Sequence, residues 1–388
     1  MKLQSKSGTR RRELKGLVPL LSGAALLPGC LVDAADAASS SGTNNARRGH
    51  EAVADPSEDH PAHPSFVAID PSELEEVGAY DADEEVSDEE VPESDATPDS
   101  GLGPLEGYTL YVEPNSRPAR QAEEWRSVDP DGAALMDRMA AEPTALWIGD
   151  WDADVANTVD NAITTADDQL RVFVVYNIPN RDCGFYSAGG ASDVDGYAEF
   201  IDNVARGLDG RTAVVILEPD ALALTTCLSA EQRTERHEMM AAAVDTLTAA
   251  GARVYIDAGD SAWISAADMA ASLIAAGIYN AAGFALNVSH TESTPDTVGY
   301  ADEVRAILGD VHYVADTGRN GIGPDSEHTW CNPLGRAVGD SPTLTTGISG
   351  LDALLWIKPP GESDGDCNGG PSAGAWWPEY ARDLVSRG

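Results

Sequence analysis

Seven short apolar runs recur along this chain, and they constrain its fold more than any other feature. Each run is rich in β-branched or aromatic residues and is apolar on both faces, which is typical of parallel strands covered on both sides. Alanine-rich stretches with helical character lie between several of them, and two of these close at Gly251 and Gly277. The runs span residues 145–151, 171–179, 213–219, 253–259, 283–288, 312–318 and 353–359.

The alternation of strands and helices predicts an α/β fold, a parallel (β/α) barrel of the TIM type. Helical patterns lie at residues 193–208, 235–251 and 261–277. The stretch between the sixth and seventh runs is rich in Gly, Pro and Thr and shows no helical pattern. Seven strands therefore fit the chain better than eight.

Polar residues gather at or just past the end of every run. In a parallel barrel these carboxyl ends converge on one mouth, where active sites lie. Solvated turn residues are the alternative, which suits Asp150 and Asp260 best, but so many polar ends together indicate a site. The set is Asp150, Arg181, Asp182, Glu218, Asp220, Asp257, Asp260, Asn287, Asp316, Arg319, Lys358, Glu362 and Asp364.

Aromatic residues accompany these polar ends. Aromatic faces pack against the C–H surfaces of sugars, while carboxylates bond hydroxyl groups, so the combination predicts a carbohydrate cleft. Core packing is the alternative for some of the aromatics, and we expect Trp147 and Trp330 to be exposed platforms. The set is Trp147, Trp151, Tyr176, Tyr186, Trp263, Trp330, Trp376 and Trp377.

Paired carboxylates on such a cleft favour glycoside hydrolysis. One carboxyl group must be protonated to give its proton to the leaving oxygen, and the other must be ionised. Crowding by other carboxylates and poor solvation would hold the first one protonated. In the stretch VVILEPDALA, Glu218 and Asp220 are both candidates for this acid.

The N-terminus has the character of an export signal, residues 1–30. A twin-arginine basic region precedes an apolar stretch that is too short to span a bilayer as a stable helix. The stretch ends in Leu-Pro-Gly-Cys, like a lipoprotein cleavage box, which predicts a lipid anchor on Cys30. An ordinary signal peptide with an incidental cysteine is the alternative. Export to the cell surface or the medium is expected in both cases.

Residues 31–104 form an acidic segment, with 20 acidic residues against two arginines, which predicts a disordered linker. The whole chain has a formal net charge of −40, which argues against nucleic acid as a partner. Beyond residue 15 the only lysine is Lys358. Adaptation to high salt and a codon bias toward arginine explain this composition equally well.

Four cysteines remain after Cys30, namely Cys183, Cys227, Cys331 and Cys367. An even number in an oxidising compartment predicts two disulfides, and three pairings are open. Neither these cysteines nor the histidines have the spacing of metal ligands, so we expect no metal and no cofactor. A monomer is expected.

The residues also carry a family resemblance. The stretches VVYNIPNRDCGFYSAGG (174–190) and VILEPDALA (215–223) resemble the two signature segments of glycoside hydrolase family 6, the cellulases. The similarity continues through DAGDSAWIS, DTGRNGIGP, TWCNPLGRAVG and WIKPPGESDG. It covers nearly all of residues 105–388, which it identifies as one catalytic domain. It implies a distorted seven-stranded barrel and inverting hydrolysis of β-1,4-glucan.

The resemblance implies a role for particular residues. The general acid falls on Asp220, and Asp182 matches the carboxylate that supports its protonation and organises the water. Asp364 matches the proposed general base, for which water-relay schemes compete. Glu218 is then expected to be a buried neighbour that positions the loop and raises the pKa of Asp220. The implied sugar-binding set is Tyr176, Trp147, Trp330, Lys358, Glu362, Asp257 and Asn287.

One position departs from the family pattern, because Asp260 stands where a histidine is usual. This exchange puts a sugar contact and the pH optimum in question. The resemblance also favours the pairs Cys183–Cys227 and Cys331–Cys367, which would pin the loops that carry the acid and the base.

Short segments after the sixth and seventh strands favour an open cleft and therefore an endoglucanase. A cellobiohydrolase of the same family and a catalytically silent glucan-binding surface protein are the alternatives.

Overall fold

The computed structural model describes residues 103–388, which form an α/β fold. The predicted signal region with Cys30, and all but the end of the acidic segment, lie outside the described residues. Among residues 103–388, no helix is both long and apolar enough to cross a membrane.

Seven parallel strands form one sheet, and their order in the sheet is their order in the chain. All seven predicted runs form strands, so the predicted seven-stranded (β/α) architecture is confirmed. Two strands begin earlier than expected, β4 by one residue at Ala252 and β7 by two residues at Leu351. The strands are β1 (Leu146–Ile148), β2 (Val172–Val175), β3 (Ala213–Leu217), β4 (Ala252–Asp257), β5 (Gly283–Leu286), β6 (His312–Asp316) and β7 (Leu351–Leu355).

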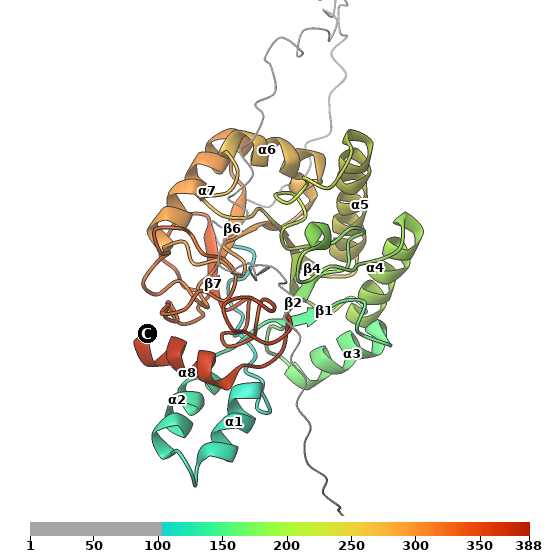
Figure 1. Cartoon of the computed structure of the whole chain (residues 1–388). Coiled ribbons are helices and arrows are strands. Elements are labelled where there is room, and N and C mark those ends of the chain that lie inside the picture. The colour runs from blue at the N-terminus through green and yellow to red at the C-terminus, as the bar shows by residue number, and fades with distance from the viewer. Residues whose placement is uncertain (1–102) are drawn as a thin grey trace, which may run out of the picture. The chain divides into compact units, whose positions relative to one another are not determined.

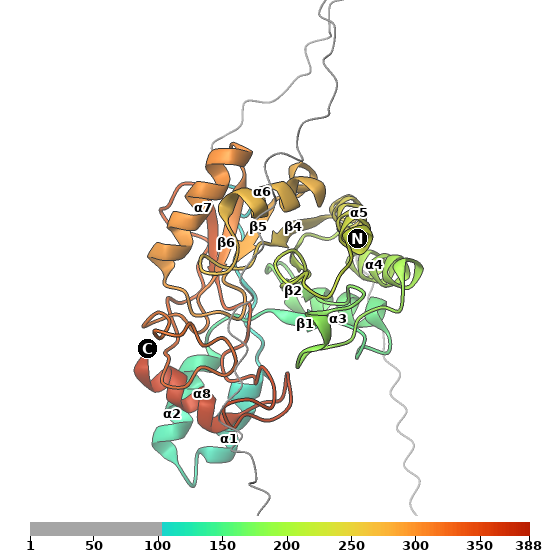
Figure 2. The ribbon, with the colours of Figure 1, turned by 45° about the horizontal axis from the view of Figure 1, so that its top comes forward.

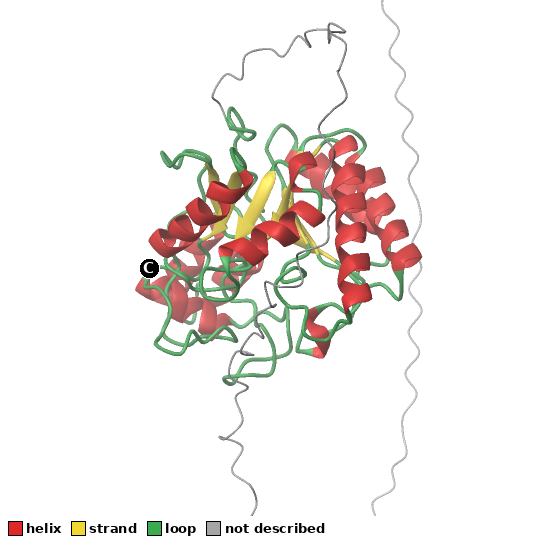
Figure 3. Cartoon of the chain, turned by 90° about the horizontal axis from the view of Figure 1, so that it is seen from above, coloured by secondary structure: helices red, strands yellow, loops and turns green. Residues whose placement is uncertain are grey.

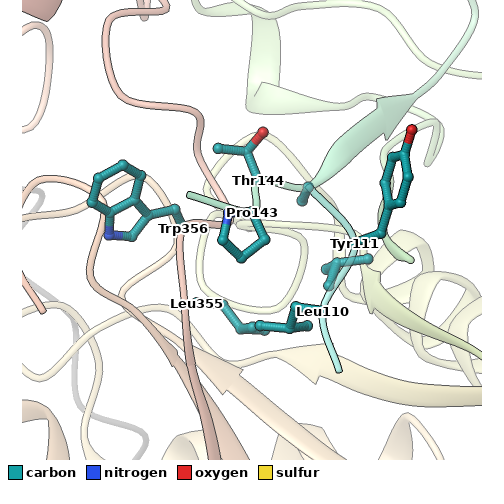
Figure 4. A pocket seen from close by; sticks show the side chains of 8 residues that line it. Leu110, Tyr111, Pro143, Thr144, Leu355 and Trp356 are labelled. Atoms are coloured by element: carbon teal, nitrogen blue, oxygen red, sulfur yellow. The ribbon is translucent and has the colours of Figure 1, made fainter. Parts of the chain in front are cut away.

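The sheet is curled, as Figure 3 shows, but its two edge strands do not pair with each other in the part of the chain that the structure describes. A single backbone hydrogen bond crosses this seam, from the Ala145 N–H to the Trp356 carbonyl at 3.2 Å. A small apolar pocket occupies the seam (Figure 4). Its lining is Leu110, Tyr111, Pro143, Thr144, Ala145, Val172, Leu355 and Trp356. None of the candidate carboxylates lines it, so this pocket is separate from the predicted site.

Five helices alternate with the strands and lie around the sheet (Figure 1). They are α3 (Val155–Ala166), α4 (Val194–Leu208), α5 (Ala230–Ala249), α6 (Ala266–Ala275) and α7 (Thr294–Leu308). The predicted helices at 193–208, 235–251 and 261–277 correspond to α4, α5 and α6. Helix α5 begins earlier than predicted, because Ser229 and Gln232 form a capping box there. Helix α6 begins later, because Ser265 caps it. No helix lies between β6 and β7, as predicted.

The strands bury both faces because their side chains alternate between two cores. Phe173 and Val175 of β2 pack into the core between sheet and helices. Val172 and Val174 of the same strand pack into a second core inside the curl of the sheet. This explains why the runs are apolar throughout rather than alternating. The carboxyl ends of the strands are therefore held on a rigid base.

Three helices outside the barrel repeat pack against each other, as Figures 1 and 2 both show. They are α1 (Arg117–Trp125), α2 (Pro130–Ala140) and α8 (Pro378–Arg387). Their own small core includes Met136, Met139 and Leu384 together with Trp356, just past β7. The segment between Trp356 and α8, which carries Asp364, is thus anchored at both of its ends. The sequence reasoning did not predict these three helices.

Candidate active site

The loop after β3 carries Glu218 and Asp220, and both residues have left-handed backbone, with φ of 50° and 68°. Glu218 is fully buried. Its carboxylate accepts hydrogen bonds from the N–H groups of Asn177 at 2.9 Å and Ile178 at 3.0 Å, past β2. Burial raises the pKa of Glu218 to about 7 despite these donors. Glu218 thus joins two strand ends, which is the positioning role that we predicted for it.

Asp220 presents about a quarter of its side chain to solvent, 25 %. Its pKa is raised to about 7, first by burial and then by the charges of Asp182, Asp260 and Asp364, while His290 opposes the rise. The carboxylates after four different strands therefore act on one another. The crowding that we predicted does come from carboxylates, but from these three and not from Glu218.

Two residues predicted to contact sugar lie beneath the surface instead. Asp257 is 1 % exposed, and its Oδ1 accepts a hydrogen bond from the Asp220 N–H at 2.9 Å. Asn287 has no exposed surface, and its side-chain amide bonds the backbone of Glu292 and the carbonyl of Asp316. These polar groups hold the loops after β3 and β5, and sugar contacts of the two residues stay a prediction.

Asp182 follows β2 in a short 3₁₀ turn, η2 (Asp182–Gly184). Its Oδ2 accepts a hydrogen bond from the Ser187 N–H at 2.7 Å. Burial raises the pKa of Asp182, although Ser187 and Arg181 act in the opposite direction. A disulfide joins Cys183 to Cys227, with 5.4 Å between their Cα atoms. It ties the loop after β2 to the loop after β3.

Asp364, past β7, has a contrasting environment. Its Oδ2 lies 2.5 Å from Nη1 of Arg319, and its Oδ1 lies 3.3 Å from Nζ of Lys358. The Asn332 N–H donates to Oδ2 at 2.8 Å. Burial acts to raise the pKa of Asp364, but the two cations outweigh it, so the pKa lies below its usual value. This carboxylate is held ionised.

The second disulfide joins Cys331 to Cys367, and both pairs are those that the family resemblance implies. It ties the loop after β6 to the segment of Asp364. Trp330, next to Cys331, is 40 % exposed, and its ring centre lies 6.1 Å from that of Tyr186. The predicted exposed platform is therefore present at Trp330.

Trp147 is half-buried rather than an exposed platform, which corrects the prediction. Its Nε1–H donates to the Ile357 carbonyl at 2.9 Å, and its ring meets Tyr176 edge to face at 5.3 Å. The Lys358 ammonium lies 5.5 Å from the centre of the Trp147 ring. Burial, followed by Asp220, raises the pKa of Tyr176 well above its usual range. Trp147, Tyr176 and Lys358 thus form one group near the carboxylates.

Glu362 is largely buried and lies 3.3 Å from Nη1 of Arg117, on α1. Burial raises its pKa, while Lys358 and Arg117 lower it. The helix that opens the domain therefore contributes a cation to a predicted sugar-binding carboxylate.

The two residues taken as the best candidates for solvated turns differ. Asp150 is exposed and pairs with Arg181 at 3.0 Å. Asp260 is 3 % exposed, and its Oδ2 lies 2.8 Å from Nδ1 of His290. The turn interpretation is therefore wrong for Asp260.

His290 is the site residue that sequence reasoning missed. Its Nε2 lies 4.0 Å from Oδ1 of Asp220. The sequence signal was available, because His290 follows β5 just as the other polar residues follow their strands.

Together these loops bring a carboxyl group whose pKa is raised to about 7 and an ionised one to the same end of a parallel barrel. Such a combination of fold and carboxylates is typical of glycoside hydrolases. The chain belongs to the glycosyl hydrolases family 6, whose family model matches residues 105–388.

Several relatives carry endoglucanase names. The chain is 42 % identical over 288 residues to endoglucanase A of Cellulomonas fimi, covering 73 % of this chain and 61 % of that protein. It is 40 % identical to endoglucanase A of Thermobispora bispora, covering 74 % of this chain and 64 % of the relative. The match thus spans less than two thirds of these two proteins. A probable 1,4-β-D-glucan cellobiohydrolase C of Aspergillus niger is 30 % identical, with 73 % of this chain and 77 % of that protein covered.

A solved structure shows the same fold. It is the endoglucanase Cel6 of Mycobacterium tuberculosis in complex with methyl-cellobiosyl-4-deoxy-4-thio-β-D-cellobioside. It is 41 % identical to this chain, with a TM-score of 0.70, and the match covers 74 % of this chain and 100 % of that one.

Proposed function

We propose that this protein is an endo-β-1,4-glucanase that hydrolyses internal bonds of cellulose or related β-glucans with inversion of the anomeric configuration. The observation that carries the proposal is the opposite pKa shift of two carboxyl groups at the same end of the barrel, raised to about 7 for the partly exposed Asp220 and lowered for the buried Asp364. An inverting glycosidase needs one protonated and one ionised carboxyl group on opposite sides of the scissile bond.

In this mechanism Asp220 gives its proton to the glycosidic oxygen as the bond from that oxygen to C1 breaks. A water molecule attacks C1 from the other face of the sugar, and its proton passes to Asp364, directly or through a second water. Asp182 supports the protonated state of Asp220, because its negative charge raises the pKa of that group. The same charge is suited to orienting the water.

The proposed sugar-binding groups combine one exposed ring with the residues that the family resemblance implies. Trp330 offers an exposed ring for a glucosyl face. Tyr176 lies under the reacting sugar, packed against Trp147. Lys358 and Glu362 then bond sugar hydroxyl groups from the far side, where Lys358 also holds Asp364.

Two observations favour the endo mode over a cellobiohydrolase. Relatives at 40–42 % identity carry endoglucanase names, while those named as cellobiohydrolases are 28–30 % identical. Only 10 residues separate Asn320 from Cys331, which leaves little chain in this loop to roof a tunnel. A silent glucan-binding protein is the second candidate, which the intact acid and base positions disfavour.

We further propose an exported monomer, with a lipid anchor at Cys30 as one form of retention. The two disulfides support an oxidising compartment.

The test is hydrolysis of carboxymethylcellulose, followed by viscosity and reducing sugar together. We expect a fast fall in viscosity with little reducing sugar, and α-anomers as the first products from cello-oligosaccharides by NMR. A slow fall in viscosity with steady release of cellobiose would contradict the endo mode. β-Anomers would contradict inversion, and binding without any product would favour the silent protein.

A further inference from the structure

A histidine–aspartate pair lies beside the candidate acid and has no part in the mechanism above. His290, in the loop after β5, is anchored through Nδ1 by the Asp260 carboxylate at 2.8 Å. Its other nitrogen, Nε2, lies 4.0 Å from Oδ1 of Asp220. The imidazole therefore stands between two carboxylates that come from the loops after β3 and β4.

Contacts on several sides fix the position of the imidazole. The Asp260 carboxylate is itself held by the Ala262 N–H at 2.7 Å. The Trp263 ring centre lies 5.5 Å from that of His290. On the other side, the Arg319 guanidinium donates to the carbonyl of Ser289, the residue before His290. Such a ring cannot swing away without breaking a buried ion pair.

The charged groups around His290 come from every neighbouring loop. Burial disfavours its cation, but Asp260 and Asp220 outweigh burial and the opposing charge of Arg319, so the pKa of His290 is raised to about 9. Asp257, at the end of β4, also lies within the electrostatic reach of His290. His290 is thus a cation at neutral pH, held by one carboxylate and facing another.

We propose that His290, held by Asp260, is a positioning residue that sets the pH range in which Asp220 acts as the acid. The proposal rests on the proposed function of Asp220. Asp182, Asp260 and Asp364 surround Asp220 with negative charge, and His290 is the cation that opposes them. When Asp220 has given up its proton, the imidazolium at 4.0 Å stabilises the new carboxylate.

The test is the pH profile of kcat/KM for His290→Gln. Removing the cation leaves Asp220 among carboxylates alone, so its pKa rises and the alkaline limb moves upward by about one pH unit. The matched control is His312→Gln, because His312 also pairs with an aspartate, Asp352 at 2.7 Å, but at the start of β6. The control should keep the wild-type limb. An unchanged limb in folded His290→Gln would overturn the proposal.

The double variant Asp260→Asn with His290→Gln tests whether the two residues act as a unit. Asp260 raises the pKa of Asp220 and His290 lowers it, so removing both should place the limb between those of wild type and His290→Gln. A limb at or above that of the single variant would contradict a paired action.

NMR titration of the His290 ring covers the case in which His290→Gln does not fold. We expect a midpoint well above that of an ordinary histidine in the wild type, and a lower midpoint in Asp220→Asn. Equal midpoints in the two proteins would overturn the proposal. This measurement needs no turnover, so absence of glucan hydrolysis would count against the proposed function alone.

Discussion

The loops after β3 and β4 and the segments after β6 and β7 each hold a carboxylate at the same end of the barrel, yet they shift its pKa in opposite directions. Asp220 has three other carboxylates around it and one histidine, and its pKa is raised. Asp364 has Arg319 and Lys358 in direct contact, and its pKa is lowered. Burial acts to raise the pKa of both groups, so the neighbouring charges decide whether each pKa ends above or below its usual value. The proposed division of labour between acid and base would therefore be a property of the loops rather than of the residue type.

Replacing the proposed acid should have the largest effect on activity, because it removes one side of the contrast between Asp220 and Asp364. Asp220→Asn keeps the shape of the side chain but has no proton to give, so we expect kcat on unactivated glucan to fall by about 10²–10⁴-fold. Binding of cello-oligosaccharides, measured by calorimetry, should persist. Asp160→Asn is the control, since Asp160 is an exposed carboxylate paired with Arg211. Near-normal rates in Asp220→Asn would dismiss the assignment of the acid.

Replacing either carboxylate by an amide should change the stability of the folded state, but in opposite directions for Asp364 and Asp220. Asp364 has a lowered pKa, so its contribution to stability is present above the unfolded pKa of about 4 and is lost as pH falls through the folded value. Asp364→Asn leaves Arg319 buried without its anion and should cost about 3–5 kcal/mol at pH 8.

For Asp220 the sign is reversed, because a raised pKa means that ionisation destabilises the folded state as pH rises from about 4 to about 7. Asp220→Asn should therefore raise the melting temperature at pH 8, with the gain vanishing near pH 4. Thermal unfolding of both variants between pH 4 and 8 tests this. Shifts of the same sign at pH 8 would refute the electrostatic contrast.

Removing the disulfide next to Asp364 should have a smaller effect, and it tests whether the position of this carboxylate matters as well as its charge. Cys367→Ser frees the segment that carries Asp364, and it should cost about 2–4 kcal/mol in the free energy of unfolding. We also expect the specific activity of the folded fraction to fall several-fold, because the proposed base is no longer fixed. Unfolding curves and active-site-corrected rates separate the two effects. If only stability changes, the bridge does not position Asp364.

The strands and the carboxylates could be predicted because both leave local signals. A run such as residues 213–219 is apolar throughout, and its last residues change abruptly to acids. The features that the sequence did not reveal depend on contacts between residues that are distant in the chain. Nothing near Asn287 indicates that its amide is used by backbone groups. Nothing near Asp260 indicates that His290, from another loop, pairs with it. Likewise, α1 and α8 contribute to one small core although they lie at opposite ends of the described chain, so no local signal indicates it.

The left-handed backbone at the strand ends sets a conflict between selection for stability and selection for activity in this protein. Asp182, Glu218, Asp220 and Asn287 all have left-handed conformations, with φ between 50° and 68°, which side chains other than glycine adopt at a cost of about 1–3 kcal/mol each. Glycine would relieve that cost at every one of these positions. At Glu218 and Asn287 the buried hydrogen bonds of the side chain offset this gain, but at Asp182 and Asp220 selection for thermal robustness alone would favour glycine and remove the proposed catalytic carboxyl groups. Improved variants should be sought in the outer helices, where selection for stability and selection for turnover do not conflict.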